Sequence, residues 1–145
     1  MTNNAITYRI NGSARKISTP IGVSMPNGNP LKFVAVWDTG ATNSVITFDV
    51  VKRLNLCPEG STVINGVTGS QSVDTYLVTF TLPNGFSKDI FTASCTVAIG
   101  CDVLIGMDII SIVDLAITSG SHGTTFSFKT PHGTEIDFSV QSSQS

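Results

Sequence analysis

An aspartate at the end of an apolar run is the residue best suited to chemistry. The run Phe33–Trp37 passes directly into Asp38-Thr39-Gly40-Ala41-Thr42. A carboxylate at the end of a buried strand is rigidly aimed, as an acid–base group must be. Gly40 lets a substrate or another backbone approach closely because it has no Cβ, and Thr39 and Thr42 supply short hydroxyls that can hold the main chain or the carboxylate. The segment predicts a proton-transfer site at Asp38, although Asp-Thr-Gly is also ordinary turn composition.

Two later segments also combine apolar residues with glycine. In one, the apolar residues Leu104 and Ile105 end at Gly106, and a short helical pattern follows over 107–112. In the other, an apolar strand enters and leaves a glycine-rich tip made of Asn65, Gly66, Val67, Thr68 and Gly69. Glycine is common in any hairpin turn, so the tip alone does not indicate a function.

With these three segments in this order, residues 31–112 resemble the retropepsin-like aspartic proteases. The half-domain of that family contains Asp-Thr/Ser-Gly, then a flap hairpin, then two apolar residues and a glycine. The resemblance is nearer to the DNA-damage-inducible and bacterial types than to viral enzymes, because Met107 stands where viral proteases usually place arginine. It implies an all-β, closed, barrel-like half-domain with one or two short helices, which acts as a symmetric homodimer.

The resemblance also implies an aspartic endopeptidase. Its chemistry needs two carboxylates about 3 Å apart that share one proton, because two like charges so close cannot both ionise. The chain has one Asp-Thr-Gly, so the second carboxylate must be Asp38 of another copy, related by a two-fold axis. Asp108 follows Gly106 closely and is interpreted as a charge at a helix start.

The resemblance gives the neighbouring residues supporting roles. Thr39 would bond across the two-fold axis, and Gly40 would contribute to substrate approach. Residues 65–69 would form the flap, and its tip, 66–69, would close over an extended peptide. Two glycines should make this tip mobile in the free dimer. Ile105 and Gly106, with Leu104 before them, would shape the core and the pocket wall.

Two other functions compete with proteolysis. The fold can serve as a peptide-binding or dimerisation module with little or no activity, because fold does not guarantee function. The intact Asp38-Thr39-Gly40 favours the protease. A serine or cysteine hydrolase is disfavoured, since no nucleophile elbow or recognisable triad context is present.

Alternating apolar and polar residues predict the strands that position these segments. The alternation covers 75–82, 91–97, 126–129 and 136–140, and a period of two is typical of strands with their apolar side chains inward. A hairpin is expected around Thr130–Thr134. Helix is predicted over Phe48–Leu54, with Thr47 as its N-cap. We expect one domain over 1–145, with frayed tails at 1–4 and 141–145.

The composition limits the partners. The chain has 145 residues, a net charge of −2 and 12% charged residues, against about 25% in an ordinary soluble domain. Low charge suggests that a partner covers part of the surface, and the acidic balance argues against nucleic acid. No apolar run is long enough for a membrane span, and the first residues lack signal-peptide features, so we expect a cytoplasmic protein.

The cysteines carry no chemistry of their own in this interpretation. Cys57, Cys95 and Cys101 are odd in number and form no CxxC pair, so a disulfide framework is not expected. With His122 and His132 they show no zinc-ligand spacing. We therefore expect neither a metal nor a cofactor.

Overall fold

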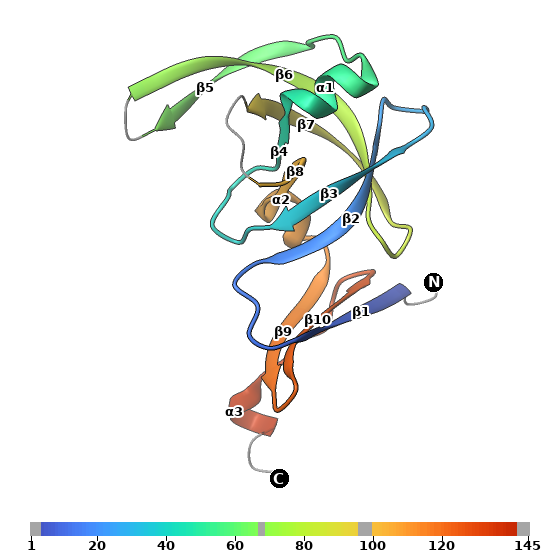
Figure 1. The fold of residues 1–145 in the computed structure, drawn as a ribbon, viewed down its shortest axis with the longest axis vertical. Helices are drawn as coiled ribbons and strands as arrows, with labels where there is room; N and C mark the ends of the chain where they lie inside the picture. Colours follow the sequence, from blue (N-terminus) through green and yellow to red (C-terminus); the bar gives the residue numbers. More distant parts are fainter. Residues whose placement is uncertain (1–3, 67–68, 96–99, 142–145) are drawn as a thin grey trace.

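Strands dominate the described part of the chain, which also contains three short helices (Figure 1). The computed structural model describes residues 4–66, 69–95 and 100–141. The strands are β1 (Asn4–Asn11), β2 (Ile17–Ser24), β3 (Leu31–Trp37), β4 (Val45–Thr47), β5 (Gly60–Gly66), β6 (Gly69–Thr81), β7 (Ser87–Cys95), β8 (Val103–Ile105), β9 (Asp114–Gly120) and β10 (Gly123–Thr130). The helices are α1 (Phe48–Leu54), α2 (Met107–Ile110) and α3 (Phe138–Gln141).

The larger sheet closes on itself. Its strand order is β2-β3-β8-β4-β7-β6-β5, and β2 also pairs with β6, where Gly22–Ser24 lie against Thr79–Thr81. β3 pairs with β8 in parallel, and so does β4 with β7. The strands from β2 round to β6 therefore form a ring, with β5 outside it. This confirms the predicted barrel-like, all-β half-domain.

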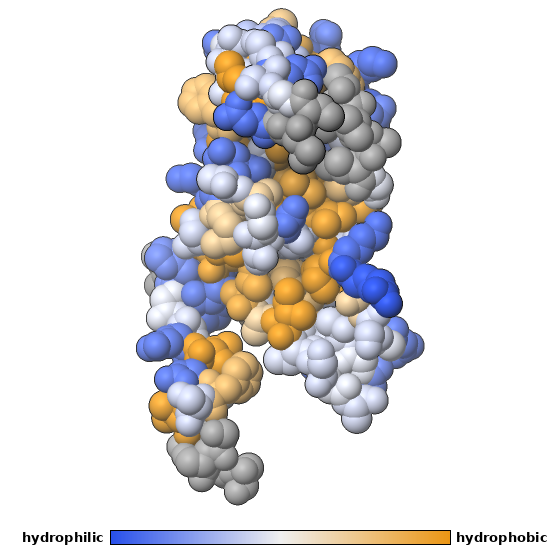
Figure 2. Space-filling view, turned by 90° about the vertical axis from the view of Figure 1, so that its left-hand side faces the viewer, coloured by the Kyte–Doolittle hydropathy of each residue, from blue (hydrophilic) through white to orange (hydrophobic). Residues whose placement is uncertain are grey.

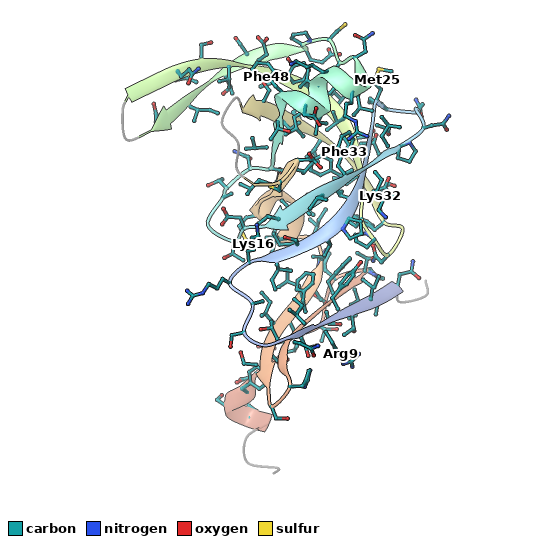
Figure 3. All side chains as sticks on the ribbon, in the orientation of Figure 1. Arg9, Lys16, Met25, Lys32, Phe33 and Phe48 are labelled. Carbon is teal, nitrogen blue, oxygen red and sulfur yellow. The ribbon has the colours of Figure 1, made fainter. Side chains whose placement is uncertain are left out.

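The smaller sheet, β1-β10-β9, packs on the ring through aromatic side chains. Trp37, the last residue of β3, lies 5.1 Å from both Phe126 and Phe128 of β10, measured between ring centroids. Each such aromatic pair stabilises the fold by about 0.5–1.5 kcal/mol beyond the effect of the area that it buries. Trp37 Nε1 donates to Thr19 Oγ1 at 2.9 Å, so its buried N–H is satisfied. Figure 3 shows side chains filling the space between the sheets, and this packing fixes the end of β3 just before Asp38.

Strand β7 turns the face opposite to the predicted one toward the core. Phe91 is 67% exposed, whereas Thr92 is 2% exposed. Directly paired residues share a face of the sheet, and Thr92 lies opposite the buried Tyr76 of β6. Thr92 Oγ1 donates to the Ser44 carbonyl at 2.9 Å, so the buried hydroxyl keeps a partner. The register with β6 therefore outweighs the apolar character of Phe91. The predicted end of this strand, at 96–97, lies outside the described residues.

The C-terminal segment is neither the hairpin nor the strand that its sequence predicts. After β10 the chain passes through 131–137 without strand and enters α3. The amides of Gly133 and Thr134 donate to the Asp114 carboxylate at 3.0 and 2.6 Å, which holds the segment to β9. Asp137 Oδ1 accepts the amide of Ser139 at 2.9 Å, as an N-cap side chain does. Local side-chain acceptors thus divert the chain from the strand suggested by its alternation.

The helix limits differ from prediction in detail. α1 has the predicted bounds, but the Thr47 hydroxyl donates to the Asp102 carbonyl at 3.0 Å instead of capping the helix. α2 ends at Ile110 rather than at 112. No helix in the described ranges is long and apolar enough to cross a membrane.

The innermost residue of each predicted tail belongs to a named element. Asn4 pairs with Thr130 in the smaller sheet, and its carbonyl accepts the side-chain amide of Asn84 at 3.0 Å. Gln141 is the last residue of α3. Residues 1–3 and 142–145 lie outside the described part of the chain.

Candidate active site

Asp38 directly follows β3 and opens the loop 38–44, here named the Asp38 loop. Its N–H donates to the Ile105 carbonyl at 2.8 Å, which continues the contact between β3 and β8. Its carboxylate Oδ1 accepts the amide of Gly40 at 2.8 Å, a local turn that aspartate favours. Two hydrogen bonds to backbone groups therefore hold Asp38, one at its own amide and one at its half-buried carboxylate.

The Asp38 loop and the segment around Gly106, which are distant in sequence, are in direct contact. The Met107 N–H donates to the Ala41 carbonyl at 2.8 Å. A Cβ added at Gly106 would lie 2.7 Å from the carbonyl carbon of Asn43 and 2.8 Å from the oxygen of Ala41. Both atoms belong to the backbone of the Asp38 loop, so a side chain at position 106 would push the loop away. The structure thus brings together the first and third segments singled out in the sequence.

Leu104 and Ile105 point to opposite faces of the ring, as neighbours on a strand do. Ile105 is completely buried in the core. Leu104 is half-buried and lies opposite Val36 and Val45 in the register of the neighbouring strands. These three side chains form an apolar outer surface on the strands that lead into and out of the Asp38 loop.

The residues after Asp38 are at the surface. Thr39, Gly40 and Thr42 are exposed, and Ala41 is half-buried. The hydrogen bond on the Asp38 carboxylate comes from the Gly40 amide, whereas the sequence suggested the threonine hydroxyls. Gly40 is closely fitted, since a Cβ there would lie 3.2 Å from Asp38 Oδ1.

The segment expected to be a flap is a β-hairpin. β5 and β6 pair with Asn65 opposite Ser70 and Gly66 opposite Gly69. Ser70 Oγ donates to Asn65 Oδ1 at 2.6 Å across the strands, and Gly69 has a φ of 125°, which L side chains rarely adopt. Figure 1 shows the hairpin projecting to the same side as the β3–β4 connection. The tip residues Val67 and Thr68 lie outside the described residues.

Ser44 and Asp108 form a contact that the sequence motifs do not reveal. The Asp108 carboxylate accepts the hydroxyl of Ser44 at 2.6 Å and its amide at 2.9 Å. It also accepts the amide of Ile109 at 2.9 Å, so the predicted helix-start contact exists beside the larger one. No sequence pattern links residues so far apart. The available signal was a serine placed directly before the apolar strand β4.

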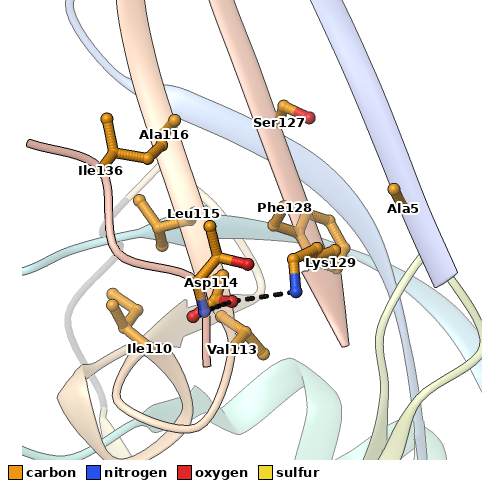
Figure 4. Close-up of a pocket in the computed structure, with 11 residues that line it drawn as sticks. Ala5, Ile110, Val113, Asp114, Leu115, Ala116, Ser127, Phe128, Lys129 and Ile136 are labelled. Carbon is orange, nitrogen blue, oxygen red and sulfur yellow. Dashed lines mark hydrogen bonds and ion pairs between the residues drawn. The ribbon is translucent and has the colours of Figure 1, made fainter. Parts of the chain in front are cut away.

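A separate cavity of about 580 Å³ lies against the smaller sheet (Figure 4). Its walls include Leu115, Phe128 and Ile136, and at its rim Lys129 Nζ lies 3.0 Å from Asp114 Oδ2. Its lining residues include no member of the Asp38 loop. This cavity is therefore distinct from the candidate active site.

Asp114 makes stability depend on pH. The amides of Gly133 and Thr134, with the ammonium of Lys129, hold the pKa of Asp114 well below its usual range. A depressed pKa stabilises the fold above the unfolded value, about 3.9, and this contribution is lost as pH falls toward the folded value. We expect Asp114→Asn to melt at a lower temperature than wild type at pH 7, with the gap narrowing below about pH 4. Melting curves of both proteins from pH 7 to pH 2.5 test this, and a gap that does not change with pH would contradict it.

Comparison with known proteins identifies the fold. No protein-family model and no curated protein sequence matches the chain. Among solved structures, a retropepsin-like aspartic protease from Rickettsia conorii superposes with a TM-score of 0.59 at 12% identity, over 91% of this chain and 95% of that one. The EIAV protease in complex with the inhibitor HBY-793 gives a TM-score of 0.52 at 24% identity, over 67% and 86% of the two chains. This chain has the retropepsin-like fold.

The retropepsin-like fold agrees with the family that the three sequence segments resemble. The resemblance seen in the three segments is confirmed at the level of fold, and the similarity to the Rickettsia conorii protease extends over most of the chain. The nearer likeness to the DNA-damage-inducible type remains a prediction.

Proposed function

We propose that this protein is an aspartic endopeptidase whose active site contains two Asp38 carboxylates, one from each protomer of a homodimer. The observation that carries the proposal is the position of Asp38, fixed at the end of β3 by Ile105 and turned by the amide of Gly40. The retropepsin-like fold supports it, because solved proteins with this fold include aspartic proteases.

The hydrogen bonds of three other aspartates support a second copy as the source of the second carboxylate. Asp102 accepts the amide of Val34 at 2.9 Å, and Asp108 accepts two groups of Ser44. Asp114 accepts the amides of Gly133 and Thr134 in the smaller sheet. These three carboxylates already have structural partners. A two-fold axis beside the Asp38 loop supplies an identical carboxylate without any further residue of the same chain.

Such a pair hydrolyses a peptide bond in two steps, each of which moves two protons. The ionised Asp38 takes a proton from a water, whose oxygen forms a bond to the scissile carbonyl carbon. The protonated Asp38 gives its proton to the carbonyl oxygen, and this yields a neutral tetrahedral intermediate. Collapse of the intermediate breaks the C–N bond as one carboxyl gives its proton to the leaving nitrogen. The other carboxylate takes a proton from a hydroxyl of the intermediate, so the pair again holds one proton.

The substrate is an extended peptide or protein segment. The β5–β6 hairpin would cover it, with backbone amides pairing in the manner of an added strand. Val63 on this hairpin is 61% exposed, so the hairpin offers apolar surface as well as main-chain donors. Leu104, Val36 and Val45 would supply the apolar wall on the ring.

Exposed apolar residues support a dimer. Ile117, Ile136 and Phe138 are all exposed on the smaller sheet and the C-terminal segment. Figure 2 shows apolar side chains gathered in the middle of one face, beside a hollow that sets α3 apart from the rest. Exposed patches of this kind mark interaction surfaces. A second copy that completes the Asp38 pair would cover part of such a face.

A dilution series tests the proposal. We expect peptide cleavage at acid pH whose specific activity rises with protein concentration, because the complete site exists only in the dimer. The dimer dissociation constant comes from sedimentation of the same preparation, and a transition-state-mimicking inhibitor of aspartic proteases should stop cleavage. Specific activity that stays constant far below that dissociation constant would indicate a site within one chain. A protein that binds the inhibitor-like peptide but never cleaves would favour the binding-module alternative.

A further inference from the structure

We propose that Asp108, acting through Ser44, is a positioning residue that holds the Asp38 loop in its working geometry. The catalytic consequence rests on the proposed function, but the geometric claim does not. Asp108 does not touch Asp38. Its effect passes through one buried serine and the backbone that surrounds the loop.

Each residue of the run 105–108 makes a hydrogen bond to the Asp38 loop. The Ile105 carbonyl accepts the Asp38 amide at 2.8 Å, and the Met107 amide donates to the Ala41 carbonyl at 2.8 Å. Between these two contacts, the Gly106 amide donates to Ser44 Oγ at 3.0 Å. Asp108 closes the series with its carboxylate on Ser44. The loop is thus held at its beginning, at its middle and at its end.

Ser44 is the point where the contacts at the end of the loop converge. Its side chain is completely buried, and its hydroxyl accepts from Gly106 while donating to Asp108 Oδ1 at 2.6 Å. Its amide donates to Asp108 Oδ2 at 2.9 Å. Its carbonyl accepts the Thr92 hydroxyl at 2.9 Å. All of its polar groups have partners, so the position of Ser44 is fixed in every direction.

The carboxylate of Asp108 is suited to this role because both oxygens accept. Oδ1 faces the hydroxyl of Ser44 and the amide of Ile109, and Oδ2 faces the amide of Ser44. An asparagine here would turn its NH₂ group toward one of these N–H donors in either orientation. Bonds from neutral donors to a carboxylate are also shorter and stronger than neutral pairs. Of the contacts between 105–108 and the loop, those of Asp108 and Ser44 use side chains, so substitution can remove them.

The test compares Asp108→Ala and Asp108→Asn with wild type. We expect Asp108→Ala to lower kcat about 10–100-fold with KM changed less than about threefold, because small displacements of a catalytic group cost rate more than binding. The kcat of Asp108→Asn should lie between the values of wild type and Asp108→Ala. In an amide NMR spectrum, the Gly40 proton should move upfield as its bond to Asp38 Oδ1 weakens.

The matched control is Asp114→Asn. Asp114 also accepts two amides, but in the smaller sheet. This variant should lose thermal stability while kcat stays within about twofold of wild type and the Gly40 resonance does not move. If Asp108→Ala does not fold, Ser44→Ala serves instead, since it removes the hydroxyl bridge and leaves the bond from the Ser44 amide to Asp108. It should give the same loss of kcat and the same Gly40 shift.

The outcomes separate this proposal from the proposed function. One outcome would overturn the positioning role alone: wild type is active, and the Asp108→Ala protein, or Ser44→Ala in its place, has the same kcat and the same Gly40 resonance as wild type. If wild type shows no hydrolysis but the Gly40 resonance moves in the variant, the positioning role stands and the protease function fails. A variant that behaves like Asp114→Asn, with lower stability and full kcat, would reduce Asp108 to a structural residue and overturn the proposal.

Discussion

Asp38→Asn is expected to lower kcat/KM for peptide hydrolysis by at least about 10⁴-fold and to leave the fold and the dimer intact. Asparagine has nearly the shape of aspartate, and its side-chain oxygen can still accept the amide of Gly40, which lies 2.8 Å from Asp38 Oδ1. It cannot take a proton from water. In a homodimer the substitution removes both carboxylates at once, so no acid–base group remains.

The measurement is peptide cleavage by purified Asp38→Asn protein beside an Asp49→Asn control. Asp49 is an exposed carboxylate in the first turn of α1, and its loss removes the same charge without touching the Asp38 loop. The control should cleave at the wild-type rate. Unchanged cleavage by the Asp38→Asn protein would rule out an aspartic protease mechanism at this residue.

Gly106→Ala is expected to destabilise the protein by about 3 kcal/mol or more, at the upper end of the cost of overpacking. The added carbon would lie 2.7–2.8 Å from backbone atoms of Asn43 and Ala41. Backbone cannot rotate aside as a side-chain end can. The Asp38 loop must therefore move, so we also expect activity to fall in whatever fraction still folds.

Thermal melting tests this, with Gly60→Ala as the matched control. At Gly60 the added carbon would meet only the side-chain oxygen of Thr75, at 3.3 Å. The control should melt close to wild type, whereas Gly106→Ala should melt lower by roughly 10 °C. Equal melting temperatures for the two variants would show that the loop tolerates a side chain at position 106.

The fold was predictable where pattern and environment agree. The apolar alternation of Tyr76, Val78 and Phe80 corresponds to a buried face, and each of these side chains is nearly or completely buried. The order of the motifs around Asp38 and Gly106 carried the resemblance to the retropepsin-like family, and the parallel pairing of β3 with β8 brings the two motifs together. Such predictions succeed because local pattern and tertiary pairing favour the same arrangement.

The failures lie where a long-range contact decides. The register with β6 buries Thr92 and exposes Phe91. The sequence of one strand does not determine the register in which it pairs with another. Asp114 binds Gly133 and Thr134 and prevents the predicted hairpin. The contact between Ser44 and Asp108 joins two loops that no periodicity relates. In each case one side-chain hydrogen bond or one pairing register outweighs local propensity.

Mixing wild-type protein with Asp38→Asn protein tests the central claim that each active site needs Asp38 from two copies. The two proteins are combined at a constant total concentration far above the dimer dissociation constant and left until subunits exchange, and the rate of peptide cleavage is then measured. If mixed dimers are inactive, activity follows the square of the wild-type fraction, so an equal mixture retains about one quarter of the activity of pure wild type. An equal mixture that retains about half, with activity linear in the wild-type fraction, would mean that each chain carries an independent site with its own Asp38 and would contradict the shared site.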